Sequence, residues 1–267
     1  MLHVVNGVRI NVLDEGEGHP LLLLHGLGGC WRDWEPQLDS LRERHRTIVV
    51  EHRGHGRSER APGPYSTDLF AADAAAVCRD LGVDHANVVG LSMGGMIAQK
   101  LALAEPHLVD ALVLCDTGTH LGARASAWLR AEAERVRGAG MPDSHGELDP
   151  AQTTWSRYTV EHQPELARTN MREAEATDPD CWAAAAVAVA DHDTSADVSR
   201  ITAPTLVVWG AEDGAIPLEL ARPLADARGG APVVVLEDAG HVCNLEQPAA
   251  FDRAIEEFFA AHPCGRG

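Results

Sequence analysis

A serine flanked by glycines lies at a position suited to a nucleophile. The segment GLSMGG, residues 90–95, comes directly after a predicted strand and directly before a predicted helix. This is the pattern G-x-S-x-G in the strand–turn–helix setting that it requires. Because the turn has to be sharp, only small side chains fit two residues before and after it, and Gly90 and Gly94 meet that need. Ser92 is the predicted nucleophile, and an ordinary glycine-rich turn is the alternative.

A serine hydroxyl is a weak nucleophile, so Ser92 needs a base that a third group orients. In strand–turn–helix enzymes of this kind the chain order is serine, acid, histidine. The chain has 14 histidines, so position along the chain has to decide between them. His241 follows a predicted strand at residues 233–236, whereas His262 falls at the tail of the last predicted helix. We predict His241 as the base. Three loop histidines precede the serine in the chain: His25, His52 and His55.

Asp213 is the predicted acid. It follows a predicted strand at residues 205–209, and a carboxylate just past a strand end can fix the imidazole tautomer and stabilise the imidazolium. Asp116, after the predicted strand that ends at Cys115, is the second candidate. Glu212 is adjacent to Asp213, but neighbouring side chains usually point apart. A turn-forming role is the alternative for Asp213.

Two backbone N–H groups are candidates for an oxyanion hole, which binds the negative oxygen that forms during acyl transfer. One belongs to Met93, the residue after the nucleophile. The other belongs to Leu27 in the segment HGLGG, residues 25–29, whose glycines let the backbone approach a substrate closely. A plain connector is the alternative. Neither G-x-G-x-x-G nor G-x-x-x-x-G-K-[ST] occurs there, so nucleotide binding is not expected.

Strands and helices alternate in the part of the chain that must position these residues. Such alternation is typical of a mainly parallel sheet with helices on both faces, where ligands bind beyond the carboxyl ends of the strands. The apolar run at residues 21–24 is typical of a strand buried on both faces. Strands are expected at residues 8–13, 21–24, 47–51, 87–91, 108–115, 205–209 and 233–236, and helices at 31–44, 67–81, 93–104 and 249–261.

Residues 118–198 interrupt this alternation. They contain no clear strand and are rich in Ala, Arg and Glu, which indicates a helical insertion within the α/β pattern. The predicted organisation is an α/β core formed by residues 1–117 and 199–267, with residues 118–198 as a helical cap.

The bulk composition argues against several classes of function. The chain has 267 residues, 45% of them apolar, and a formal net charge of -18. A negative field of this size opposes binding to nucleic acid and to anionic membranes. The start of the chain lacks the basic and apolar regions of a signal peptide, and no apolar run approaches the ~20 residues of a membrane helix. We expect a cytoplasmic protein with no nucleic-acid or membrane partner.

The six cysteines are scattered without the spacing of a zinc site. We expect reduced thiols that pack as small apolar side chains, with no metal and no cofactor.

Together the segments HGLGG, RGHGRS, GLSMGG, GAED and GHVCNLEQP resemble the α/β-hydrolase superfamily, in the same order along the chain. The resemblance implies an eight-stranded sheet and a cap inserted after the sixth strand. Within the superfamily, GLSMGGMIAQ, VLCDTGTHLG and ATDPDCWAAAAVAVADHD are most similar to 3-oxoadipate enol-lactonases, which cleave a small carboxylate-bearing enol-lactone in aromatic catabolism. On this resemblance Ser92 attacks the lactone carbonyl, His241 relays the proton, and water releases the acyl-enzyme.

Arginine and tryptophan side chains in and near the cap are candidates for contact with such a substrate. An anionic substrate would need a local positive patch on this acidic protein, although a solvated helix face is the alternative for each arginine. The arginines are Arg124, Arg130, Arg157 and Arg172. The tryptophans that are candidates for lining the pocket, with burial in a core as the alternative, are Trp31, Trp128 and Trp155.

Other functions are compatible with the same triad. Acyl transfer, cofactor-free perhydrolysis and a tailoring esterase of natural-product pathways would all use the same residues. A ligand receptor on the same scaffold is the non-enzyme alternative. The complete set of Ser92, Asp213 and His241 argues against that alternative, since a binding protein has no need of all three. The sequence does not indicate the oligomeric state.

Overall fold

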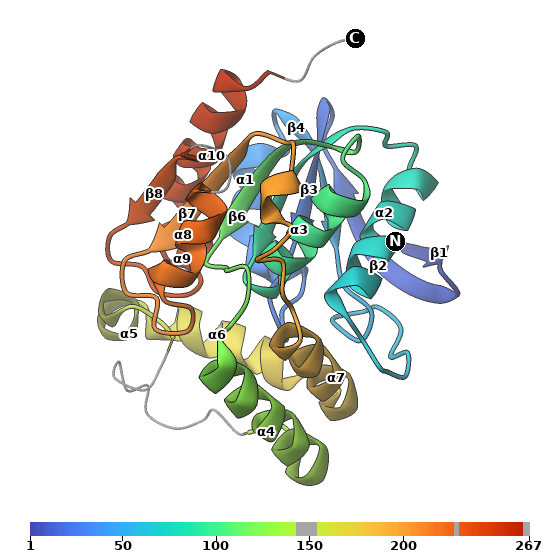
Figure 1. The fold of residues 1–267 in the computed structure, drawn as a ribbon, viewed down its shortest axis with the longest axis vertical. Helices are drawn as coiled ribbons and strands as arrows, with labels where there is room; N and C mark the ends of the chain where they lie inside the picture. Colours follow the sequence, from blue (N-terminus) through green and yellow to red (C-terminus); the bar gives the residue numbers. More distant parts are fainter. Residues whose placement is uncertain (143–153, 227–229, 264–267) are drawn as a thin grey trace.

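The protein is described by a computed structural model, which covers residues 1–142, 154–226 and 230–263. In these residues eight strands form one sheet, in the order β1-β2-β4-β3-β5-β6-β7-β8 (Figure 1). The pairs β1/β2 and β2/β4 are antiparallel, and the other pairs are parallel. The predicted α/β fold with a mostly parallel eight-stranded sheet is confirmed. The strands are β1 Leu2–Val5, β2 Val8–Glu15, β3 His19–Leu24, β4 His45–Val50, β5 Ala86–Leu91, β6 Val109–Cys115, β7 Thr205–Gly210 and β8 Val233–Leu236.

Strand β1 was not expected from the sequence. It pairs with β2 through a two-residue turn at Asn6 and Gly7, whose φ angles are 49° and 77°. Asn-Gly favours such a turn because both residues tolerate positive φ, so this dipeptide is the signal that identifies the hairpin.

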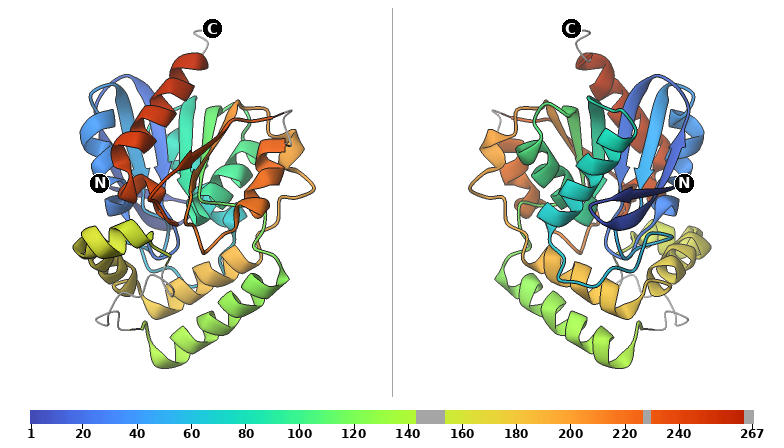
Figure 2. Two further views of the ribbon diagram at one scale, coloured as in Figure 1. Left: turned by 90° about the vertical axis from the view of Figure 1, so that its left-hand side faces the viewer. Right: turned by 90° about the vertical axis from the view of Figure 1, so that its right-hand side faces the viewer.

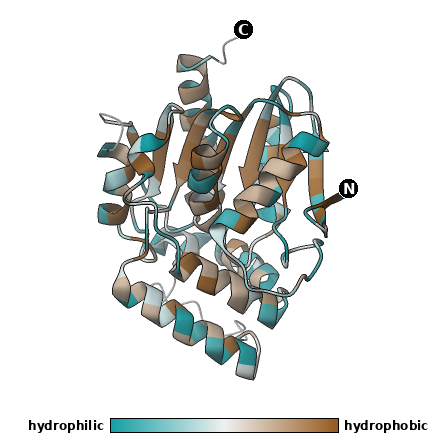
Figure 3. Ribbon diagram, turned by 45° about the vertical axis from the view of Figure 1, so that its right-hand side comes forward, coloured by the Kyte–Doolittle hydropathy of each residue, from teal (hydrophilic) through white to brown (hydrophobic). Residues whose placement is uncertain are grey.

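Helices cover both faces of the sheet (Figure 2). Alternate residues of β3 belong to two hydrophobic cores, one on each face of the sheet. Leu22 and Leu24 pack with helices α2 and α3, and Leu21 and Leu23 pack with helices α1 and α10. All four leucines are fully buried, as expected for a strand covered on both faces. Figure 3 shows the central strands as hydrophobic and the helices as mixed. The core helices are α1 Glu35–Leu41, α2 Thr67–Asp80, α3 Met93–Ala104, α8 Leu218–Asp226, α9 Cys243–Glu246 and α10 Pro248–Ala261.

The helices differ from the prediction in two places. The expected helix at residues 31–44 is a 3-10 turn, Trp31–Trp34, followed by the separate helix α1. Pro36 lies in the first turn of α1, where its missing N–H suits a new helix start. Helix α8 was not predicted from the sequence, and it contains Pro223, a residue that disfavours helix interiors.

In the part of the chain that the structure describes, four α-helices lie between β6 and β7 and pack over one end of the sheet (Figure 1). We call α4 to α7 the cap. The glycine-rich loop after β3 contacts the cap, since a side chain at Gly28 would meet Ala174 and Trp182. The cap therefore covers the carboxyl ends of the parallel strands. That the cap domain begins at residue 118 and ends at residue 198 stays a prediction. The cap helices are α4 Ala123–Ala139, α5 Arg157–His162, α6 Pro164–Glu175 and α7 Pro179–Ala190.

Among the helices of the described residues, none is both long and apolar enough to cross a membrane.

Candidate active site

The turn between β5 and α3 holds Ser92 in a strained backbone conformation. Its φ and ψ are 52° and -115°, and a positive φ is uncommon for a residue other than glycine. A Cβ at Gly90 would overlap the Gly94 carbonyl, and a Cβ at Gly94 would overlap the Leu24 carbonyl at the end of β3. The two glycines are therefore required because backbone segments touch at both positions.

The structure brings Ser92, His241 and Asp213 together from three loops at the carboxyl end of the sheet. The Ser92 Oγ lies 2.9 Å from Nε2 of His241, and Nδ1 of His241 lies 3.0 Å from both carboxylate oxygens of Asp213. The side chain of Asp213 is fully buried, and its Oδ1 also accepts hydrogen bonds from the N–H groups of Ala215 and Ile216. Neutral His241 can thus donate from Nδ1 to Asp213 and accept the Ser92 hydroxyl at Nε2.

The electrostatic surroundings favour a positive charge on His241. Burial by itself lowers the pKa of the imidazole, but the carboxylates of Asp213, Asp116 and Glu246 together outweigh it and raise the pKa above its ordinary value of 6.5. Protonation of His241 during a reaction is therefore supported by its neighbours.

The other acids near this pair face different partners. Glu212 accepts a hydrogen bond from the N–H of Arg157 in the cap at 2.8 Å, so it points away from His241. The Asp116 carboxylate accepts hydrogen bonds from the N–H groups of Gly210 and Cys243. Asp213 is the carboxylate that the structure places against the imidazole.

The glycine-rich loop at residues 25–29, which contains Leu27, lies against the proposed nucleophile Ser92. A Cβ built at Gly26 would be 3.6 Å from Cβ of Ser92, and Met93, the next residue after Ser92, begins α3. The N–H of His52 donates to Nε2 of His25, so the other ring nitrogen, Nδ1, carries the proton and donates to the Gly26 carbonyl at 2.8 Å. A neutral His25 thus fixes this loop. Burial supports that state, because it lowers the pKa of His25 to about 4.

A buried carboxyl beneath the same loop was not identified from the sequence. Asp33 accepts hydrogen bonds from the N–H of Gly26 and from Nδ2 of Asn170, the latter at 3.0 Å. Burial raises the pKa of Asp33 to about 7 against the effect of these two donors. Since Asn170 belongs to α6, Asp33 links the cap to the loop beside Ser92. No local sequence pattern marks this pair, because its members are 137 positions apart.

The tryptophan candidates occupy three different environments. Trp128 lies on α4 with 65% of its surface exposed, so it does not occupy the buried cap core that was its alternative role. That its ring lines the substrate pocket stays a prediction. Trp155 is 4% exposed and packs with Ala167 and Leu245, which corresponds to its alternative role in a core. Trp31 is partly buried, with the Arg32 guanidinium 4.7 Å from its ring centre.

The cap arginines do not form a buried positive patch. All four are exposed; Arg130 is paired with Asp191, and Arg157 is paired with Glu161. These positions correspond to the solvated helix face that was the alternative. The four are Arg124, Arg130, Arg157 and Arg172.

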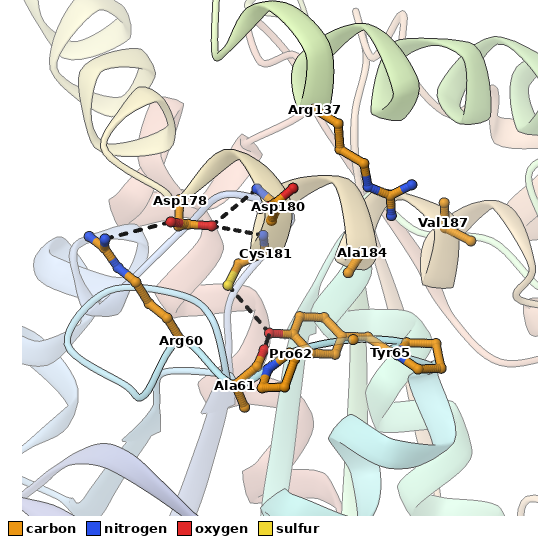
Figure 4. Close-up of a pocket in the computed structure, with 12 residues that line it drawn as sticks. Arg60, Ala61, Pro62, Tyr65, Arg137, Asp178, Asp180, Cys181, Ala184 and Val187 are labelled. Atoms are coloured by element: carbon orange, nitrogen blue, oxygen red, sulfur yellow. Dashed lines mark hydrogen bonds and ion pairs between the residues drawn. The ribbon is translucent and has the colours of Figure 1, made fainter.

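A cavity of about 620 Å³ lies between the loop at residues 60–65 and helices α4 and α7 (Figure 4). Its lining residues include none of Ser92, Asp213 and His241. Several of its polar groups bond to one another, because Arg60 pairs with Asp178 and the Tyr65 hydroxyl donates to the Ala61 carbonyl. We assign no ligand to this cavity.

In the described residues, one group of potential metal ligands has its atoms within 4.8 Å of one another: Cys115, Asp116 and Cys243. Both Asp116 oxygens accept backbone hydrogen bonds, and burial raises the pKa of both thiols, to about 12 for Cys115. Protonated thiols are poor metal ligands. The three side chains therefore act as buried hydrogen-bonding neighbours.

Comparison with known proteins gives a consistent family. The family model described as alpha/beta hydrolase fold matches residues 19–248. The chain is 30% identical over 240 residues to 3-oxoadipate enol-lactonase 2 of Acinetobacter baylyi, covering 88% of this chain and 86% of the relative.

Two solved structures are similar over nearly the whole chain. A thermophilic esterase from Thermogutta terrifontis has a TM-score of 0.88 and 31% identity, with 96% of this chain and 94% of the esterase covered. The enol-lactonase from Burkholderia xenovorans LB400 has a TM-score of 0.88 and 28% identity, with 97% of this chain and 100% of the lactonase covered. Esterase and lactonase are thus about equally similar to this chain.

Proposed function

The chain belongs to the α/β-hydrolase fold family, and on that basis we propose that it is a serine hydrolase that cleaves a small ester or lactone. The observation that carries the proposal is the continuous hydrogen-bonded series from Ser92 through His241 to Asp213 at the carboxyl end of the sheet. This series has the composition and order that activate a serine for acyl transfer.

In the proposed reaction Ser92 forms an acyl-enzyme. Nε2 of His241 takes the hydroxyl proton as Oγ attacks the carbonyl carbon, and Asp213 stabilises the resulting imidazolium. The N–H groups of Met93 and Leu27 are the proposed donors to the negative carbonyl oxygen. His241 then gives the proton to the leaving oxygen as the C–O bond breaks. In the second half His241 takes a proton from water and the hydroxide attacks the acyl carbon. The bond from that carbon to Oγ of Ser92 then breaks, His241 gives the proton to Oγ, and the free acid is released.

A small enol-lactone such as that of 3-oxoadipate is the proposed substrate to examine first. Its support is the resemblance of the segments GLSMGGMIAQ and VLCDTGTHLG, together with 30% identity to an enol-lactonase. A simple carboxylic ester is the second candidate, because the esterase relative is as similar in structure.

The test is turnover of short p-nitrophenyl esters and of an enol-lactone panel. We expect Ser92→Ala to lower kcat at least ~10⁴-fold, because the nucleophile is lost. Ser126→Ala, on the exposed cap helix α4, is the matched control and should keep full activity. A fluorophosphonate should add its phosphonyl group to Oγ of Ser92 in the native protein, with release of fluoride, and the mass should rise by that of the reagent less HF. Full activity in Ser92→Ala, or no turnover by the native chain, would refute the proposal.

Product analysis separates hydrolysis from transfer on the same triad. With an alcohol acceptor or hydrogen peroxide present, a hydrolase still releases mainly the free acid. If the transfer product or the peracid predominates at low acceptor concentration, acyl transfer or perhydrolysis is the activity. Tight ligand binding without turnover would indicate the receptor alternative.

A further inference from the structure

A buried carboxylate behind the triad bonds to the chain on both sides of the acid–base pair. Asp116 follows β6 directly and is fully buried. Its Oδ1 accepts the N–H of Gly210 at 2.8 Å, and its Oδ2 accepts the N–H of Cys243 at 3.0 Å. Gly210 precedes Asp213 by three residues, and Cys243 follows His241 by two. One side chain therefore joins the loop of the acid to the loop of the base.

The backbone at Asp116 is held in a conformation that few residues adopt easily. Its φ is 45°, and its N–H donates to the Val208 carbonyl of β7 at 3.1 Å. Aspartate and asparagine tolerate positive φ better than other residues with a side chain. This conformation accompanies an inward-pointing carboxylate at the junction of β6 and β7.

The charged and titratable groups that face Asp116 make its charge relevant to His241. They are Asp213 and His241 from the loops after β7 and β8, and the thiols of Cys115 and Cys243. Burial and the Asp213 carboxylate raise the pKa of Asp116 to about 7, against the effect of His241 and the two N–H donors. Glu246 of α9 also faces His241, but its oxygens accept the N–H groups of Ser156 and Gly240.

We propose that Asp116 is a positioning residue of the triad: it fixes the loops of Asp213 and His241 relative to each other and stabilises the imidazolium without touching substrate. The inference rests on the proposed serine hydrolase function. A purely structural role is the alternative, in which Asp116 only satisfies two buried N–H groups. The two roles differ in their effect on the proton affinity of His241.

Asp116→Asn is the test variant, because asparagine keeps the size and the tolerance of positive φ but removes the charge. It also turns one acceptor into an NH₂ group that faces a backbone N–H. We expect kcat for p-nitrophenyl acetate to fall about 10- to 100-fold with little change in KM, as for a displaced catalytic pair. The acidic limb of kcat/KM should move about 0.5–1 pH unit lower, because a negative charge near His241 is lost.

Asp110→Asn is the matched control, since Asp110 lies on the same strand at its opposite end. It should leave kcat and the acidic limb unchanged. If Asp116→Asn lowers the melting temperature but shifts neither kcat nor the limb, the residue is structural and the inference fails. If instead the wild-type chain neither turns over ester nor reacts with a fluorophosphonate, the proposed function itself fails.

A measurement on the native chain covers the case in which Asp116→Asn does not fold. The amide proton resonances of Gly210 and Cys243 should shift together as pH is varied around 7, because both N–H groups donate to the same carboxylate. The value of kcat/KM should change at the same pH as these two resonances. Amides that titrate at different pH values, or a shift without any change in kcat/KM, would overturn the inference.

Discussion

Three carboxylates lie near one imidazole, and each has a different hydrogen-bonding role. Asp213 bonds to the ring, Asp116 bonds to the two loops, and Glu246 bonds to the backbone of the base loop and of the cap. Their combined charge explains why the pKa of His241 is raised although the ring is buried. The proposed base is thus protonated more readily than an ordinary imidazole.

The pH dependence of activity follows from this shift. His241 has to be neutral to accept the Ser92 proton, and its pKa lies above 6.5, so activity is present above that pKa and lost as pH falls through it. We expect kcat/KM for an uncharged ester to fall about tenfold per pH unit on the acidic side. A profile of kcat/KM that is flat from pH 8 to pH 5 would contradict the role of His241.

Asp213→Asn should lower kcat about 10⁴-fold, whereas the adjacent control Glu212→Gln should leave it within about twofold.

At the scale of elements, the nucleophile depends on close contact between strand ends and a helix start. Gly94 in the first turn of α3 has no room for a Cβ, because the carbonyls of Leu24 and His25 occupy the space. The turn at Ser92 between β5 and α3, the end of β3 and the glycine-rich loop at residues 25–29 are therefore packed as one unit.

Gly94→Ala should separate these elements. We expect it to lower the free energy of unfolding by about 1–3 kcal/mol and to lower kcat at least ~100-fold, because the Ser92 turn and the adjacent loop must shift. Gly138→Ala is the control: in α4 no atom lies within 4 Å of the added Cβ, so stability should stay equal or rise by about 0.5–1 kcal/mol. Urea unfolding and ester turnover measure both effects; a fully active Gly94→Ala would show that the turn is not tightly packed.

One of the hydrogen bonds between the cap and the site loops holds the loop beside Ser92. Asn170 of α6 donates to the buried carboxyl of Asp33, which in turn holds the N–H of Gly26. Asn170→Ala should lower kcat about 3- to 10-fold, since the bond to a charged group is worth about 1.5–3 kcal/mol and only part of it reaches the loop. Thr169→Ala, exposed on the same helix, is the control and should behave as wild type. Equal kcat in both variants would show that the cap does not position this loop.

At the scale of the whole molecule, buried neutral histidines set the stability at acid pH. Burial lowers the pKa of His25 and His192 to about 4, that of His55 to about 3, and that of His52 well below 6.5. The unfolded chain therefore binds more protons at these sites as pH falls below 6.5. Asp33 and Asp116, whose pKa values are raised to about 7, act in the opposite direction over a similar range.

Burial also lowers the pKa of His19 and raises that of Asp252, so five histidines oppose three carboxyls. The free energy of unfolding should therefore fall between pH 6.5 and pH 4.5. Each histidine contributes at most about 1.4 kcal/mol per pH unit. His192→Gln should make this dependence shallower by up to that amount, because one buried neutral ring is removed. His162→Gln, on an exposed cap residue, should leave the slope unchanged. Urea unfolding at several pH values measures the slopes, and identical slopes for both variants would refute this account.

The sequence by itself predicted the fold class, which the structure confirms, and a candidate triad. Apolar runs and the helix pattern marked most strands of the core, and the glycines around Ser92 marked the turn. The order serine, acid, histidine then singled out Asp213 and His241. These signals are local, because strand ends, tight turns and helix starts restrict the residues next to them.

Only the tertiary structure decided which distant groups meet. Asp33 with Asn170, and Asp116 with the loops after β7 and β8, involve partners 94 to 137 positions apart. The solvent exposure of Trp128 and the burial of Trp155 were undecided for the same reason. Such contacts depend on how separate elements pack against each other. Many different pairs of side chains fit a packed interior while the sequence pattern around each residue stays the same, so the pattern does not identify the partner. For Asp116, the sequence offered a second candidate acid, whereas packing placed it against the backbone of both triad loops.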